Sequence, residues 1–213
     1  MNAGPRGLSA VPAVADRLSE INKAHVAPLS NLVRELLVEH PGDVPWFDPA
    51  SGGITARVLL LLEAPGRRAA PSPAGASVKT SGFVSLDNDD QTAANLHHLV
   101  AEAGLDRELV LMWNIVPWYL SDATHGKIRA ASRSDIDAGA PWLRRLVELL
   151  HDLRVAVLLG DKALRGWSRV SSQLSMPIHL LGCPHPSPQL LAPHPERRDE
   201  ILRALLKAKH LAT

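Results

Sequence analysis

The chain has 213 residues, enough for one sizeable hydrophobic core, and 46% of them are hydrophobic while 21% are charged. These proportions are ordinary for a globular domain and exclude a largely disordered chain. The formal net charge of +1 neither requires nor excludes a nucleic-acid partner. The single cysteine, Cys183, excludes an internal disulfide and a metal site built mainly from thiolates, so we expect no metal and no other cofactor.

The apolar segments are short. The longest apolar run, residues 58–62, is far below the roughly 20 residues that span a bilayer. The first ten residues lack the apolar stretch of a secretory signal. We therefore expect a cytoplasmic protein with no membrane partner.

The predicted elements begin with helices. Apolar spacing over residues 18–37 predicts amphipathic helices with a break near Pro28, so residues 1–56 are expected to be a helical N-terminal extension of one domain spanning 1–213. Strands and helices then alternate. Strands are predicted at 57–62, 109–113, 155–159 and 178–181, and helices at 92–103, 141–153, 161–170 and 195–210.

The predicted strands are almost wholly apolar, which indicates a parallel sheet covered on both faces. The expected fold class is therefore α/β: a three-layer α/β/α sandwich with a central, mostly parallel four-stranded sheet. Ligands of open parallel sheets bind outside the carboxyl ends of the strands. Residues that follow the strands are therefore candidate site residues.

Three polar side chains follow three different strands. Glu63 opens "EAPG", Asn114 lies in "WNIVPW", and His185 lies in "CPHPSP". Each also has a simpler interpretation: Glu63 as a loop carboxylate, Asn114 as a residue that fixes a turn, and His185 as the partner of a loop carbonyl. Their convergence on one edge favours a ligand site.

Two predicted loops carry positive charge without an acidic residue. The first, residues 64–86, has Arg67, Arg68 and Lys79, and the second, residues 125–134, has Lys127, Arg129 and Arg133 as its basic residues. Either loop is a solvated basic face or a surface that steers a nucleic-acid strand.

Four short motifs occur in order at these strand ends: "LEAPG" at 62–66, "SGF" at 81–83, "WNIVPW" at 113–118 and "HPSPQLL" at 185–191. Together they resemble the uracil-DNA glycosylase superfamily over roughly residues 57–193. The members with a similar first motif use four cysteines for an iron–sulfur cluster, so this chain resembles a cluster-free relative. Leu62 stands where the family often has glycine, and Gly66 where one branch has the tyrosine that excludes thymine.

The resemblance implies roles for the site residues. Glu63 would be catalytic, either activating a water or stabilising the sugar cation, and His185 would donate a hydrogen bond to the departing base. Asn114 would read the uracil edge, Phe83 would stack on the base or else pack in the core, and the backbone of Ala64 and Gly66 would approach the substrate.

The resemblance also implies contacts with DNA. Ser187 would contact phosphate, Gln189 with Leu190 or Leu191 would enter the vacated base stack, and Lys127 and Arg129 would steer the strand. The two leucines have an alternative place, packed under the final helix.

The implied function is hydrolysis of the N-glycosidic bond of deoxyuridine in single- or double-stranded DNA, by a monomer, which releases uracil and leaves an abasic site for base excision repair. Two alternatives stay open: a non-catalytic protein of the same fold that binds damaged DNA or abasic sites, and a hydrolase of free nucleosides.

Overall fold

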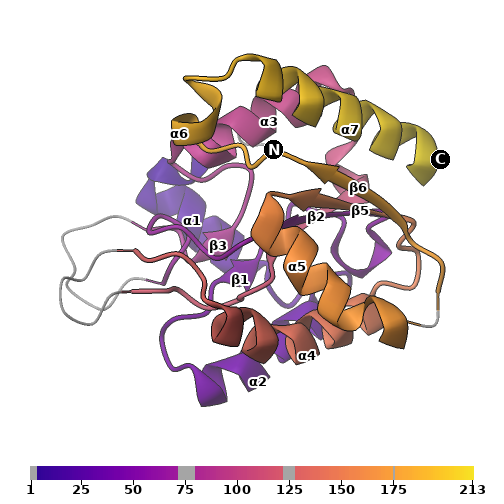
Figure 1. Cartoon of the computed structure of the whole chain (residues 1–213). Helices are drawn as coiled ribbons and strands as arrows, with labels where there is room; N and C mark the ends of the chain where they lie inside the picture. Colours follow the sequence, from indigo (N-terminus) through magenta and orange to yellow (C-terminus); the bar gives the residue numbers. More distant parts are fainter. Residues whose placement is uncertain (1–3, 72–79, 122–127, 175) are drawn as a thin grey trace.

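The centre of the computed structural model, which describes residues 4–71, 80–121, 128–174 and 176–213, is a parallel sheet in the order β4-β2-β5-β6 (Figure 1). Its strands are β2 (Val58–Leu62), β4 (Val110–Asn114), β5 (Val155–Leu159) and β6 (His179–Cys183). All three pairings are parallel, with Leu62 opposite Asn114 and Leu159 opposite Cys183. The predicted four-stranded parallel sheet is confirmed.

Helices cover both faces of the sheet because the residues of each buried strand alternate between the two faces. Leu59 and Leu61 belong to a core shared with α2, α4 and α5, whereas Leu60 and Leu62 belong to a core shared with α3 and α7. The helices span Ala27–Glu39 (α2), Gln91–Glu102 (α3), Arg133–Leu149 (α4), Asp161–Val170 (α5) and Glu196–Ala212 (α7). The three-layer α/β/α sandwich is thereby confirmed.

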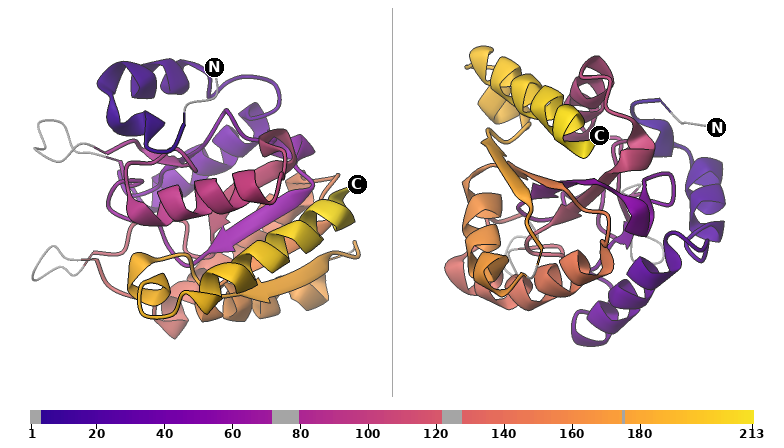
Figure 2. Two further views of the ribbon diagram at one scale, coloured as in Figure 1. Left: turned by 90° about the horizontal axis from the view of Figure 1, so that it is seen from above. Right: turned by 90° about the vertical axis from the view of Figure 1, so that its right-hand side faces the viewer.

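The N-terminal region contains more than helices. Besides α1 (Val11–Ser19) and α2, it contributes the short strand β1 (Trp46–Phe47), which pairs in parallel with β3 (Phe83–Val84). Figure 2 shows α1 outside the main sheet, on the side opposite to β6. The shorter elements are 3₁₀ turns at Gly7–Ser9, Gly53–Thr55, Arg107–Leu109 and Ser171–Gln173, and the helix α6 at Pro188–Leu191. No helix in the described ranges is long and apolar enough to cross a membrane.

Helix α4 begins earlier than the sequence predicts. The expected start at Pro141 is wrong, because Ser132 and Asp135 form a capping box that begins the helix at Arg133 and leaves Pro141 in its interior. Next to it, Gly139 packs against the chain after β4, where an added Cβ would lie 2.0 Å from the carbonyl oxygen of Ile115. The extra turns of α4 fix residues 128–132 beside the end of β2.

Candidate active site

A cavity of about 350 Å³ opens at the carboxyl edge of the sheet, as expected for a ligand site in a parallel α/β fold. Glu63, Asn114 and His185 all line it. They come from the ends of β2 and β4 and from the segment after β6, so the structure brings together the three polar residues that the sequence singles out. Ala64, Gly66 and Arg129 line the same cavity.

Glu63 is held through one of its two carboxylate oxygens. The backbone N–H of Ala131 donates to Oε1 of Glu63 at 2.6 Å, and the Glu63 carbonyl accepts from the N–H of Val116 at 2.9 Å. Lys162 Nζ in turn donates to the Ala131 carbonyl at 2.6 Å. No donor among the described residues reaches Oε2 of Glu63, so that oxygen is available to a water or substrate. The Ala131 contact has no sequence signal, because a backbone amide is the donor.

Asn114 contributes its side-chain amide to the lining of the cavity. Asn114 is only 4% exposed, and no described residue forms a hydrogen bond with its side chain. Buried amides normally have partners, because an unpaired buried polar group costs about 1–3 kcal/mol. An amide that is nearly enclosed yet faces a cavity is therefore suited to bind a ligand that carries both a donor and an acceptor.

His185 lies close against Gly160, where a Cβ would sit 3.2 Å from the Cβ of His185. Gly160 also has a φ of +93°, so glycine is favoured there for both sterics and backbone conformation. Burial lowers the pKa of His185 below its ordinary value of 6.5, although the nearby carboxylates of Glu63 and Asp90 oppose this effect. The imidazole is thus neutral at neutral pH and donates through one N–H.

A pH titration of His185 is expected to show its midpoint below 6.5. Since the lowered pKa belongs to the folded state, the unfolded chain binds the proton more tightly, and the free energy of unfolding decreases as the pH falls below 6.5. NMR detection of the imidazole, with His185→Gln to assign the signal, measures the midpoint. A midpoint at or above 6.5 would contradict the assignment of burial as the dominant influence.

The opposite wall of the cavity was missed by sequence reasoning. It is formed by residues 84–93, here called the β3–α3 wall, which contribute Ser85, Asn88 and Asp90. Asn88 Nδ2 donates to the Phe83 carbonyl at 2.9 Å and its Oδ1 accepts from Ser81 Oγ at 2.6 Å, while Asp90 caps α3 by accepting from the Ala93 N–H. The available signal was the polar run that follows "SGF".

Phe83 is fully buried and does not line the cavity, so its stacking role stays a prediction. The predicted DNA-contacting residues that follow His185 do not line this cavity. Ser187 precedes α6, Gln189 is exposed within α6, and Leu190 lines a neighbouring cavity. Leu191 packs against the core formed with α3 and α7.

The second basic loop is partly neutralised. Arg129 forms a bidentate ion pair with Asp135, at 2.6 and 2.9 Å, so its charge is balanced by an acid, and its role in steering a DNA strand stays a prediction. The pairing acid lies one residue beyond the loop as we delimited it. Lys127 lies outside the described residues.

A second cavity, of about 720 Å³, shares Glu63 and His185 with the first. Lys162, Arg197 and Gly160 are among its other lining residues. The carboxylate and the imidazole therefore line two adjoining cavities, one lined also by the Asn114 amide and the other by Lys162 and Arg197 together with Asp161 and Glu200. No three His, Cys, Asp or Glu side chains gather as metal ligands in the described part of the chain.

The structure is thus a parallel α/β/α sandwich with a carboxylate, an amide and an imidazole at one edge of the sheet, and comparison with known families identifies the class of protein to which it belongs. The family profile of the Uracil DNA glycosylase superfamily matches residues 49–208. The chain belongs to this superfamily. No curated protein sequence matches it.

Two solved structures are similar to this one. The crystal structure of SMUG2 from Pedobacter heparinus matches with a TM-score of 0.50 and 12% identity, covering 73% of this chain and 77% of that one. Mimivirus uracil-DNA glycosylase matches with a TM-score of 0.37 and 17% identity, covering 85% of this chain and 71% of that one. At these identities the likeness to SMUG2 supports the fold alone.

Proposed function

We propose that this protein is a monofunctional uracil-DNA glycosylase, which hydrolyses the bond between uracil and deoxyribose in DNA. The observation that carries the proposal is the convergence of Glu63, Asn114 and His185 on one cavity. Membership of the superfamily is consistent with it. The expected product is DNA with an abasic site.

Glu63 would supply the negative charge that the reaction requires near the sugar. Cleavage of an N-glycosidic bond develops positive charge on the sugar and negative charge on the departing base. Oε2 of Glu63, which has no donor among the described residues, would orient and deprotonate a water or stabilise the sugar cation, while the Ala131 N–H holds the other oxygen. Lys162 fixes Ala131 and hence this orientation.

His185 and Asn114 would bind the base through hydrogen bonds. A neutral His185 would donate to uracil O2 as negative charge develops there, much as an oxyanion-hole donor does. The Asn114 amide would donate to O4 and accept from N3–H. Cytosine reverses both contacts, because it presents an amino donor and a bare ring nitrogen at these positions.

The two adjoining cavities suit a nucleotide turned out of the helix. A base inside duplex DNA is unreachable, so the nucleotide is extruded or the strand is single. The base would occupy the cavity lined by Asn114, and the sugar–phosphate the cavity lined by Lys162 and Arg197. Glu63 and His185, which line both, would then flank the glycosidic bond.

The test uses end-labelled oligonucleotides that carry uracil, hypoxanthine or xanthine, in single and double strands. Alkaline cleavage after incubation reveals abasic sites, and we expect cleavage at uracil in the presence of EDTA. Tight binding without release of the base would favour a damaged-DNA binding protein instead. Hydrolysis of free deoxyuridine, with oligonucleotides left intact, would favour a nucleoside hydrolase.

A further inference from the structure

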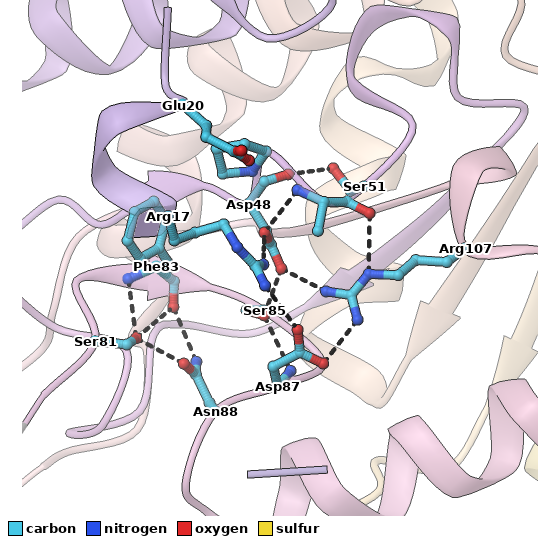
Figure 3. Close-up of polar contacts among 12 residues, drawn as sticks. Arg17, Glu20, Asp48, Ser51, Ser81, Phe83, Ser85, Asp87, Asn88 and Arg107 are labelled. Carbon is cyan, nitrogen blue, oxygen red and sulfur yellow. Dashed lines mark hydrogen bonds and ion pairs between the residues drawn. The ribbon is translucent and has the colours of Figure 1, made fainter. Parts of the chain in front are cut away.

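The β3–α3 wall is held from behind by a ring of four charged side chains, of which Arg107 is partly exposed and the other three are buried (Figure 3). Arg17 donates to both Asp48 and Asp87, and Arg107 donates to the same two carboxylates, at 2.6 Å to Asp48 and 2.7 Å to Asp87. Asp48 is 3% exposed and Asp87 is fully buried. Burial would raise the pKa of Asp48, but the ion pairs with Arg107 and Arg17 outweigh it and lower the pKa.

The ring is connected to the cavity through Ser85. Ser85 Oγ donates to Asp48 at 2.5 Å and accepts from the backbone N–H of Asp87 at 3.0 Å, and Ser85 itself lines the cavity. Asn88, which also lines the cavity, follows Asp87 directly. A displacement of Asp87 therefore moves two cavity-lining residues.

One member of the ring, Arg17, is distant in sequence from the wall. Arg17 lies in α1, and residues 6–17, here called the N-terminal strap, contact the β3–α3 wall at three points. Arg6 donates to Gln91 at 3.0 Å and pairs with Asp89, the Leu8 N–H donates to the Asp87 carbonyl at 3.0 Å, and Arg17 donates to the Asp87 carboxylate at 3.2 Å.

Helix α1 has little other attachment to the protein. Of the nine residues of α1, Arg17 is buried and the other eight are half-buried or exposed. A cavity of about 920 Å³ lies beside Arg17, between α1 and residues 49–52. An arginine is an unusual residue to anchor a helix, because burying its charge is costly unless it is paired. The anchoring is thus specific to the two aspartates.

We propose that the N-terminal strap positions the base-contacting wall of the active site and that Arg17 is its positioning residue. The inference rests on the proposed function for its kinetic consequence, but its structural content does not depend on it. The strap lies before residue 49, where the superfamily match begins, so it is outside the matched region.

The strap acts on the part of base recognition that the β3–α3 wall provides and not on the catalytic carboxylate, because the wall and Glu63 lie on different supports. Glu63 follows β2 and Asn114 is the last residue of β4, both in the main sheet, whereas Ser85 and Asn88 lie on the wall that the ring holds. Loss of Arg17 leaves Asp48 and Asp87 with Arg107 as their shared cation among the described residues, so the wall loosens while the sheet stays intact.

Hydrogen exchange tests the structural content directly, in Arg17→Lys, Arg17→Gln and Arg6→Ala variants of the full chain. Lysine keeps the charge but lacks the fork that bridges two carboxylates. We expect amides of residues 83–91 to exchange about tenfold faster in Arg17→Gln, with a smaller increase in Arg17→Lys, while β2, β4 and β5 stay protected. The matched control is Lys23→Ala, which removes an exposed ion pair with Glu20 beside the 920 Å³ cavity next to Arg17.

Arg6→Ala keeps the test decisive if the buried substitutions prevent folding. It removes the exposed contacts to Asp89 and Gln91 and leaves the ring intact, so it is expected to speed exchange of residues 87–91 by about twofold. Unchanged exchange of residues 83–91 in every folded variant overturns the proposal. So does an increase spread evenly over the whole chain.

Kinetics tests the consequence for recognition. In Arg17→Lys we expect inhibition by free uracil to weaken about tenfold and KM for uracil DNA to rise, while the single-turnover rate at saturating DNA changes less than about twofold. An equal fall in both parameters, or none, overturns the recognition role. If the wild-type protein releases no base, the proposed function fails alone, and exchange still decides whether the strap holds the wall.

Discussion

Replacement of Glu63 by glutamine is expected to lower the single-turnover rate of uracil release about 10²- to 10⁴-fold, the range of general-base catalysis. Glutamine is nearly isosteric and keeps an oxygen that accepts from the Ala131 N–H, so the side chain stays in place while charge and basicity are lost. The loss should be similar for every base released, because Glu63 does not touch the base edge in the proposed arrangement. Rapid-quench assays with uracil and hypoxanthine oligonucleotides measure both quantities.

Glu148→Gln provides the matched control for Glu63→Gln. Glu148 is exposed on α4, where it pairs with Arg144, and the same change of charge should leave the rate unaltered. A Glu63→Gln protein that retains the wild-type rate would remove Glu63 from the reaction.

Asn114→Asp is expected to reduce kcat/KM for uracil about 10- to 100-fold, because the substitution removes the donor to O4 and leaves an unpaired acceptor in a nearly buried place. The amino group of cytosine gains an acceptor in exchange, so the ratio of uracil to cytosine release should fall further than the uracil rate itself. Competition between uracil and cytosine oligonucleotides measures the ratio.

Asn31→Asp controls for the amide-to-acid change. Asn31 is exposed on α2 and accepts from Arg34, so this substitution should alter neither the rate nor the base ratio. If the uracil-to-cytosine ratio is unchanged in folded Asn114→Asp, another residue reads the base.

The layers of the fold were predictable because they depend on local patterns. The continuous apolar run at residues 58–62 predicts a strand buried on both faces, and the helix at Asp161–Val170 was predicted with its observed bounds. The start of α4 is not predicted, because proline is typical of the first turn of a helix, whereas Pro141 lies inside a helix that the capping box of Ser132 and Asp135 begins at Arg133. Strands β1 and β3 have two residues each, too few for a periodic pattern.

The candidate site also has a part that the sequence predicts and a part that it does not. Glu63, Asn114 and His185 were predicted because the topology of a parallel sheet gathers residues that follow its strands. The ring of charged side chains was not predicted, because Arg17, Asp48 and Asp87 are widely separated in sequence. A charged residue in a helix is also normally solvated. Long-range pairing of this kind leaves no periodic trace.

The strands that carry the three site residues differ in how firmly they are bound. Strand β2, which ends next to Glu63, is hydrogen-bonded on both sides, whereas β6, which leads to His185, pairs with β5 alone among the described strands and has exposed residues along it. Local opening of an edge strand requires less free energy than opening of an inner one. We therefore expect the imidazole to belong to a less stable cooperative unit than the carboxylate, and partial denaturation to separate His185 from Glu63 before the core unfolds.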